Sequence, residues 1–507
     1  MFKKHPKGLL AASLANMGER FGFYTMMAIL SLFLMAKFGL AESQAGLIYS
    51  IFYFSIYGCA FIGGLIADKT KNFKGTILIG LCLMALGYVL IAIPTPTPVP
   101  PESFTMYLGL TCLGLFIIAF GNGLFKGNLL ALVGQMYDNK QYEPMRDSGF
   151  SLFYMFINVG AIFAPLTAVG IRNWWVESHG FTYDPSMPEL CHKYLDGTLQ
   201  GDGLAKLESF ASGGYASVGD FVNSYLNVFA TGFHYAFIAA IVAMIISLVI
   251  YLTNKNNFPD PTVKTSTDAA AVDMDPKEVK QRIYALLAVF AVVIFFWFSF
   301  HQNGLTLTFF AKDYTRISGI NINLGFTRLQ GVELFQSCNP FFVVFLTPVI
   351  MAFFAWLKSK GKEPSTPKKI AIGMGIAASA YLLMTICSAA AGLPTKEEIT
   401  AMGGLPDPSR VTPLLLLGTY FILTVAELFI SPLGLSFVSK VAPPKYQGLM
   451  QGLWLCATAA GNQLLFIGAI LYESIPIWAT WLVFVGTCSI SMITMLCMLK
   501  WLERIAK

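Results

Sequence analysis

The sequence predicts an all-α integral membrane protein with twelve transmembrane helices arranged as two six-helix bundles. Three observations carry this prediction. The 507 residues are 55% hydrophobic and only 12% charged, whereas soluble domains carry about 25% charged residues. The mean hydropathy is +0.62. The apolar residues are gathered into long runs separated by short polar stretches.

A membrane span needs about 20 apolar residues in sequence. The first half of the chain contains six such segments, at roughly 9–35, 45–67, 75–93, 106–134, 147–171 and 229–253. The second half contains six more, at roughly 282–311, 332–357, 369–392, 412–439, 448–472 and 477–499.

The polar stretches divide the chain into domains. We predict an N-terminal bundle over residues 1–253, a polar linker over 254–281 and a C-terminal bundle over 282–507. Residues 172–228 form a long loop that we expect to be a small cap with its own helices. Two six-helix halves joined by a linker is the layout of major facilitator transporters, whose substrate site lies near the membrane midplane.

The distribution of basic residues predicts the orientation. If the N-terminus lies inside, inside segments hold 23 of the 34 lysines and arginines, outside segments hold nine, and two lie within spans. Cytoplasmic loops are enriched in these residues. We therefore expect both termini in the cytoplasm and a multi-pass protein of the inner (cytoplasmic) membrane. The apolar run after residue 7 is too long for a cleavable signal peptide.

Charged side chains inside spans are costly and mark functional sites. The first half carries Arg20 and Lys126 in its spans, and the second half carries Glu427. Arg20 shares a helix face with Asn16 and Tyr24, which are four residues away on either side. Glu19 lies about 100° around the helix from Arg20, so we expect that the two need not be bonded to each other.

A cavity between these groups would be positive on one side and negative on the other. A ligand that matches such a field has a carboxylate at one end and an ammonium group at the other, as an amino acid or a short peptide does. The alternative is that the charges pair with one another and only hold helices together.

Several blocks of sequence resemble the proton-dependent oligopeptide transporter family. They are "RDSGFSLFYMFINVGAIFAP" (146–165), "FQSCNP" (335–340), "STPKKIAIG" (365–373), "AELFISPLGLSFVSKVAPP" (426–444) and "GLMQGLWLCATAAGNQL" (448–464). The "ERF" of "NMGERFGFY" (16–24) resembles the ExxERFxYY motif of that family. The resemblance extends over nearly all spans and implies uptake of di- and tripeptides, driven by protons, through alternating access.

The resemblance also implies roles for individual residues. Arg20 and Lys126 would bind the peptide carboxylate, and Glu427 with Asn158 and Asn339 would bind its amino terminus. Side-chain pockets would be lined by Tyr24, Tyr154, Trp297 and Trp454, with Ser431 beside Glu427.

The chain departs from the family pattern at two acidic positions. Asn16 replaces the first glutamate of the motif, and His301 replaces the acid expected opposite Lys126. We therefore expect a neutral His301, a neutral Lys126 or a bridging anion. The candidates for the coupling proton are Glu19, His301 and Glu427. A facilitator of peptides or amino-acid-like solutes, with weak or non-standard proton coupling, is the alternative function.

Other classes of function have less support. A peptide sensor would need an output domain, and the tails and linker are short. We find no nucleophile–base pair or metal-ligand spacing, so we predict no enzyme, no metal and no cofactor. The expected partners are small peptides, protons and the lipid bilayer, with no nucleic acid, and we expect the monomer to function.

Overall fold

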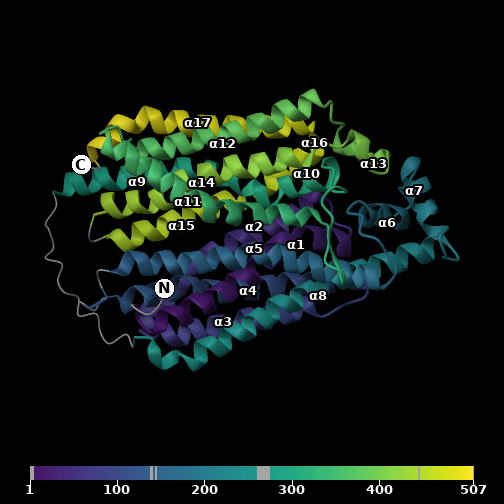
Figure 1. Ribbon diagram of the computed structural model, residues 1–507, viewed down its shortest axis with the longest axis horizontal. Helices are drawn as coiled ribbons and strands as arrows, with labels where there is room; N and C mark the ends of the chain where they lie inside the picture. The colour runs from purple at the N-terminus through teal and green to yellow at the C-terminus, as the bar shows by residue number, and fades with distance from the viewer. Residues whose placement is uncertain (1–4, 138–140, 143–144, 260–274, 444–445, 506–507) are drawn as a thin grey trace.

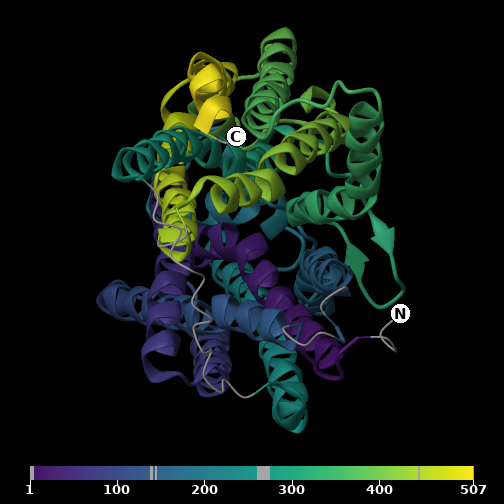
Figure 2. The ribbon, with the colours of Figure 1, turned by 90° about the vertical axis from the view of Figure 1, so that its left-hand side faces the viewer.

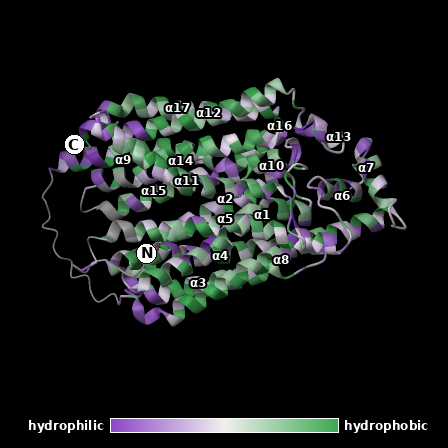
Figure 3. Cartoon of the chain, viewed as in Figure 1, coloured by the Kyte–Doolittle hydropathy of each residue, from purple (hydrophilic) through white to green (hydrophobic). Residues whose placement is uncertain are grey.

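The computed structural model describes residues 5–137, 141–142, 145–259, 275–443 and 446–505. Within these residues, twelve helical segments are long and apolar enough to cross a membrane, which confirms the predicted number. Their apolar residues cover the middle of the molecule, and hydrophilic residues gather at both ends (Figure 3).

The first six spans form one bundle. They are α1 (Gly8–Phe38), α2 (Glu42–Thr70), α3 (Phe73–Ala92), α4 (Phe104–Met136), α5 (Arg146–Ser178) and α8 (Val218–Thr253). Within it, α1 packs against α5 and α8, and α4 packs against α2 and α3.

The last six spans form the second bundle, and three of them are interrupted. They are α9 (Pro276–Phe300) with η5 (His301–Gly304) and α10 (Thr306–Tyr314), η6 (Val332–Ser337) with α11 (Cys338–Ser359), α12 (Thr366–Ala390), α14 (Pro413–Val441), α15 (Gln447–Gln463) with α16 (Leu465–Ser474), and α17 (Ile477–Ile505). The predicted linker 254–281 includes residues 260–274, which lie outside the described residues.

The two bundles lie side by side, with their helices roughly parallel to the long axis (Figures 1 and 2). They meet where α2 packs against α15 and α16, and where α5 packs against η6 and α11. Both chain termini lie at one end, which we call the terminal end (Figure 1). The opposite end carries short elements, namely α6 (Met187–Leu195), α7 (Asp202–Ala211), α13 (Lys396–Ala401), β1 (Ile322–Asn323) and β2 (Arg328–Leu329).

Residues 179–217, which we call the cap, stand at that opposite end, the cap end (Figure 1). The expectation of a cap with its own helices is confirmed by α6 and α7. The flanking spans are longer than predicted, because α5 continues to Ser178 and α8 already begins at Val218. The 36 residues of α8 extend over about 54 Å at 1.5 Å per residue. Its outer turns pack against α6 and α7.

Two of the helix breaks face each other. The Gln302 side chain at η5 donates from Nε2 to the Leu465 carbonyl oxygen, 3.3 Å away, where α15 gives way to α16. It also accepts a hydrogen bond from Thr306 Oγ1 at 2.5 Å. Backbone groups inside a membrane need such internal partners. One buried glutamine therefore stabilises both interruptions, which the sequence pattern had suggested to be continuous spans.

Small residues let α2 approach α4. A Cβ atom at Gly63 would lie 2.3 Å from the Gly123 carbonyl oxygen, whereas Gly64 has open space at the same point. We expect Gly63→Ala to lower the free energy of unfolding by about 1–3 kcal/mol through overpacking. Gly64→Ala, with the same change in helix propensity, should be neutral or slightly stabilising. Thermal unfolding of the two purified variants would test this, and equal stabilities would contradict the close contact.

Candidate substrate site

The acidic and basic residues of α1 are paired with each other. Arg20 donates from Nε and Nη2 to the two carboxylate oxygens of Glu19, at 2.6 and 2.8 Å. Asn122 on α4 donates a further hydrogen bond to Glu19. Both charged side chains are buried. The expectation that Glu19 and Arg20 need not be bonded is therefore corrected. The arginine side chain is long enough to reach around the angle of about 100° between neighbouring residues of a helix. Burial favours pairing of opposite charges.

Lys126 on α4 is the cation of this region that has no ion-pair partner. Within the described part of the chain no carboxylate lies within 4 Å of its ammonium group. The ammonium nitrogen lies 4.3 Å from the ring centroid of Tyr57 on α2. It is within electrostatic range of Arg20 and Glu19, whose charges offset each other. Among the described residues, Lys126 is therefore the unpaired basic side chain on the first half of the site, and it is partly exposed.

The negative side of the site is formed by α14 and α11. Glu427 accepts a hydrogen bond of 2.8 Å from Asn339 Nδ2, which also donates to Thr424 Oγ1 at 3.1 Å. Glu427 and Asn339 are partly exposed, as is Ser431 one turn further along α14. The predicted neighbourhood of Glu427 and Asn339 is present, with the carboxylate accessible and free of any cation within 4 Å among the described residues.

Tyrosines lie between the two poles. Tyr24 on α1 and Tyr57 on α2 are each within electrostatic range of both Arg20 and Glu427. Charges from the two bundles therefore converge on one region near the middle of the spans. Tyr53, which was missed at the sequence level, belongs to the same group, since the spacing Tyr49–Tyr53–Tyr57 places these rings on one face of α2.

His301 lies at the break between α9 and α10, surrounded by aromatic rings. It stacks on Trp297 with ring centroids 4.8 Å apart, and Tyr53 of the first bundle lies at the same distance. Its Nδ1 lies 2.5 Å from Oδ1 of Asn462 on α15. A carboxamide oxygen only accepts, so this hydrogen bond requires a proton on Nδ1, and the neutral ring then has its lone pair on Nε2. Lys126 is within electrostatic range but makes no direct hydrogen bond to it.

Four other predicted residues make few side-chain contacts with the charged groups of the site. Tyr154 is 47% exposed, and Asn158 donates to the carbonyl oxygen of Tyr154 on its own helix. Trp454 is buried with its ring against Gly434 on α14. Trp297 is buried too, and its Nε1 has no hydrogen-bond partner among the described residues.

Ion pairs between the bundles close the cap end. Arg172 on α5 pairs with Glu333 in η6, and both side chains are almost fully buried. Lys312 on α10 pairs with Glu42 on α2 at 2.9 Å. Arg172 and Lys312 are two of the nine basic residues that the sequence places in outside segments. The pairing could not be read from local spacing, because each pair joins residues more than 150 positions apart.

These features define a multi-pass membrane protein of the major facilitator fold, whose two bundles contribute the oppositely charged residues of the candidate site. A family model described as the POT family matches residues 74–274 and 260–477. The chain belongs to the POT family.

Individual relatives agree with this assignment. The "Peptide transporter YePEPT" of Yersinia enterocolitica is 28% identical over 91% of this chain and 87% of its own. The "Dipeptide and tripeptide permease B" of Salmonella typhimurium is 27% identical over 90% and 85%. A crystal structure of a peptide transporter POT in complex with sulfate shares the fold, with a TM-score of 0.74 and 22% identity, over 100% of this chain and 96% of that one.

Proposed function

We propose that this protein imports di- and tripeptides by proton symport with alternating access. The observation that carries the proposal is the pair of accessible opposite charges, Lys126 and Glu427, on facing bundles with tyrosines between them. A zwitterionic peptide would place its carboxylate at Lys126 and its ammonium group at Glu427 and Asn339. The names of the relatives, which include peptide, dipeptide and tripeptide transporters, support the substrate class.

The paired state of Arg20 sharpens the roles within this site. Because Glu19 already occupies the guanidinium group, Lys126 is the primary carboxylate anchor and Arg20 shapes the field behind it. Trp297, Tyr24, Tyr154 and Trp454 offer apolar surface that suits varied peptide side chains. We place the protein in the inner membrane as a monomer, with the terminal end in the cytoplasm, as the distribution of basic residues favours.

His301 is the proposed carrier of the coupling proton. Its Nε2 lone pair is free to accept a proton, whereas the carboxylate of Glu19 accepts bonds from Arg20 and Asn122 and would have to give one up. Protonation of His301 would bring a second positive charge near Lys126. That repulsion gives the protonated state a different preference between conformations, which coupling requires.

The alternative, a facilitator with weak or non-standard coupling, is favoured by two observations. Asn16 cannot titrate, and His301 is held by Asn462 and two aromatic rings, an arrangement that also suits a purely hydrogen-bonding role.

Uptake of a labelled dipeptide into proteoliposomes, with an internal pH dye, tests both functions. We expect wild-type protein to acidify the lumen as peptide enters, and His301→Ala to bind peptide but lose uphill accumulation, because it has no proton acceptor at this position. Counterflow measures the remaining exchange activity. A His301→Ala variant that moves protons at the wild-type ratio would exclude His301 as the carrier. Wild-type counterflow without any acidification would favour the facilitator.

A further inference from the structure

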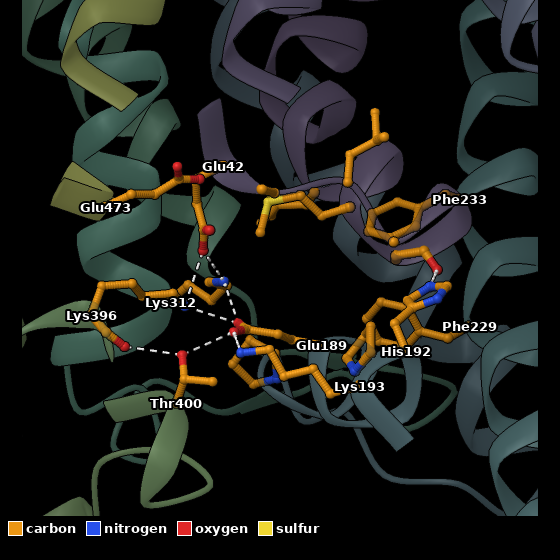
Figure 4. A pocket seen from close by; sticks show the side chains of 18 of the residues that line it. Glu42, Glu189, His192, Lys193, Phe229, Phe233, Lys312, Lys396, Thr400 and Glu473 are labelled. Atoms are coloured by element: carbon orange, nitrogen blue, oxygen red, sulfur yellow. Dashed lines mark hydrogen bonds and ion pairs between the residues drawn. The ribbon is translucent and has the colours of Figure 1, made fainter. Parts of the chain in front are cut away.

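The cap is fastened to the second bundle through one carboxylate. Glu189 on α6 contacts Lys396 Nζ at 2.8 Å and Lys312 Nζ at 3.2 Å through Oε2. Its Oε1 accepts a hydrogen bond of 3.2 Å from Thr400 Oγ1. Lys396 and Thr400 belong to α13 and Lys312 to α10, so all three contacts cross from the first half of the chain to the second (Figure 4).

These contacts belong to a larger cluster of charges at the cap end. The two lysines also meet Glu42 on α2, at 2.9 and 3.0 Å. Lys396 further contacts Asp313 Oδ2 at 3.0 Å. Glu189 is the most accessible of the carboxylates that bind these two lysines, with 22% of its side chain exposed against 6% for Glu42 and 3% for Asp313. It is therefore the member that water reaches first.

The surroundings of Glu189 favour release rather than permanent packing. A cavity of about 330 Å³ lies between the cap and the two bundles, and Glu189 lines it together with Glu42, Lys312 and Lys396. Close to these ion pairs, Gly403 lies against the backbone of Gly203 in the cap. The cap meets the second half here through ion pairs and glycine contacts, which separate without exposing a large apolar surface.

We propose that Glu189 is a gating residue of the transport cycle. Its ion pairs with Lys396 and Lys312 hold the cap against the second bundle while the cap end is closed. These ion pairs must break before that end opens. The inference rests on the proposed alternating-access function. The cap end is then held closed both by the ion pairs between the membrane spans and by the contacts of the cap.

The ion pairs of Glu189 are insensitive to pH over the physiological range. Burial opposes ionisation of Glu189, but Lys396 and Lys312 outweigh it and hold the pKa of this carboxyl well below its ordinary value. Burial likewise opposes the charge on Lys396, but Asp313, Glu189 and Glu42 raise its pKa well above the ordinary value. Among the described residues, the groups that contact Glu189 or its lysines are Lys193 on its own helix, Lys312 and Asp313 on α10, Glu42 on α2 and Lys396 on α13. His192, Glu473 on α16 and Arg410 line the same pockets as Glu189.

The lowered pKa of Glu189 and the raised pKa of Lys396 determine how the ion pair responds to pH. A lowered carboxyl pKa gives stabilisation that is present above the ordinary pKa and lost only as the pH falls through the lowered value. A raised lysine pKa gives stabilisation that is lost only as the pH rises through the raised value. Between about pH 5 and 10 the stabilisation by the ion pairs of Glu189 is therefore retained.

The test compares Glu189→Gln with Glu208→Gln. Both remove one negative charge from the cap, but Glu208 on α7 is exposed, and its carboxylate has no ion-pair or hydrogen-bond partner among the described residues. Hydrogen exchange measured by mass spectrometry reports opening of segments 187–211 and 396–411. We expect exchange about tenfold faster in Glu189→Gln, at pH 6 and pH 8 alike, and unchanged in Glu208→Gln.

Uptake kinetics give the second readout. If Glu189→Gln raises the fraction of carriers open at the cap end, the KM for external dialanine falls by several-fold. A damaged fold would not produce a lower KM. Thr400→Val, which removes one hydrogen bond only, should shift both readouts in the same direction by less, and it replaces Glu189→Gln if that variant is not stably made.

Exchange in Glu189→Gln equal to that in Glu208→Gln would overturn the proposal. Faster exchange with an unchanged or raised KM would also overturn it, because the contact would then be structural and not gating. Failure of wild-type protein to take up dialanine would refute the proposed function instead, and the exchange comparison requires no substrate.

Discussion

Glu427→Gln is expected to lower the uptake of dipeptides, as kcat/KM, by at least about thirtyfold. Truncating one member of a hydrogen-bonded charge pair costs about 2–5 kcal/mol, and the peptide ammonium group would lose its only charged partner in the proposed pose. The side-chain oxygen of the glutamine can still accept a hydrogen bond from Asn339, in place of the 2.8 Å bond that Glu427 accepts. The measurement is initial-rate uptake in proteoliposomes against peptide concentration.

The matched control is Glu503→Gln at the terminal end. Its carboxylate accepts a hydrogen bond from Ser365 and lies on α17, outside the candidate site, so uptake should remain within about twofold of wild type, as for an ordinary surface substitution. A further readout is discrimination against N-acetylated dipeptide, which wild type should reject and Glu427→Gln should not. If Glu427→Gln still prefers the free amino terminus, Glu427 is not the amine anchor.

Arg172→Met is expected to lower the free energy of unfolding by about 3–5 kcal/mol, because it strands a buried carboxylate. Glu333 has 0% of its side chain exposed, and its Oε2 already lacks a hydrogen-bond partner among the described residues. Removing both charges in Arg172→Met/Glu333→Leu should restore most of the loss. Thermal unfolding of the purified protein in detergent, followed by tryptophan fluorescence, measures this.

Arg328→Met is the control at the same end of the molecule. Arg328 and Glu177 are 3.8 Å apart with 53% and 32% of their side chains exposed, and such surface pairs contribute about 0–1 kcal/mol. Equal losses in Arg172→Met and Arg328→Met would show that the buried pair does not join the bundles as described. The same result would weaken the view that this end is held shut mainly by charge.

The number of spans was predictable because twelve apolar segments of membrane length are a local property of the sequence. The interruptions at residues 301–304 and at Leu464 were not. His301 to Gly304 are polar but lie inside a segment long enough for one continuous span. Whether the helix breaks there depends on the contact of Gln302 with the Leu465 carbonyl oxygen on another span. Such a contact is long-range information that periodicity does not contain.

The residue types of the site were also predictable, but their pairing was not. Helix spacing places Cβ atoms, and the guanidinium group of Arg20 lies several bonds beyond its Cβ, so spacing alone could not exclude the bond to Glu19. Asn122 and Asn462 could have been noticed as amides inside apolar spans. Tyr53 and Tyr57 could have been found from their spacing of four.

The basic residues of the cap end could be counted from the sequence, but their ion-pair partners could not be predicted. Lys312 and Lys396 were informative as a count, since their scarcity on that side predicts orientation. Their individual surroundings depend on how α2, α6, α10 and α13 come together. The sequence places Glu42, Glu189 and the two lysines in four separate segments, and only the assembled fold makes them one cluster.

The length of α8 turns the first bundle and the cap into a lever. The helix has no proline along its 36 residues and extends over about 54 Å, well beyond the roughly 30 Å of the hydrocarbon layer. Rotation by about 10° about its inner end would swing its outer end by about 9 Å. The contacts of Glu189 with Lys396 and Lys312 are only 2.8 and 3.2 Å long, so a displacement of this size at α6 would break both of them. In the proposed transport cycle, a modest tilt of α8 would therefore be enough to release the cap.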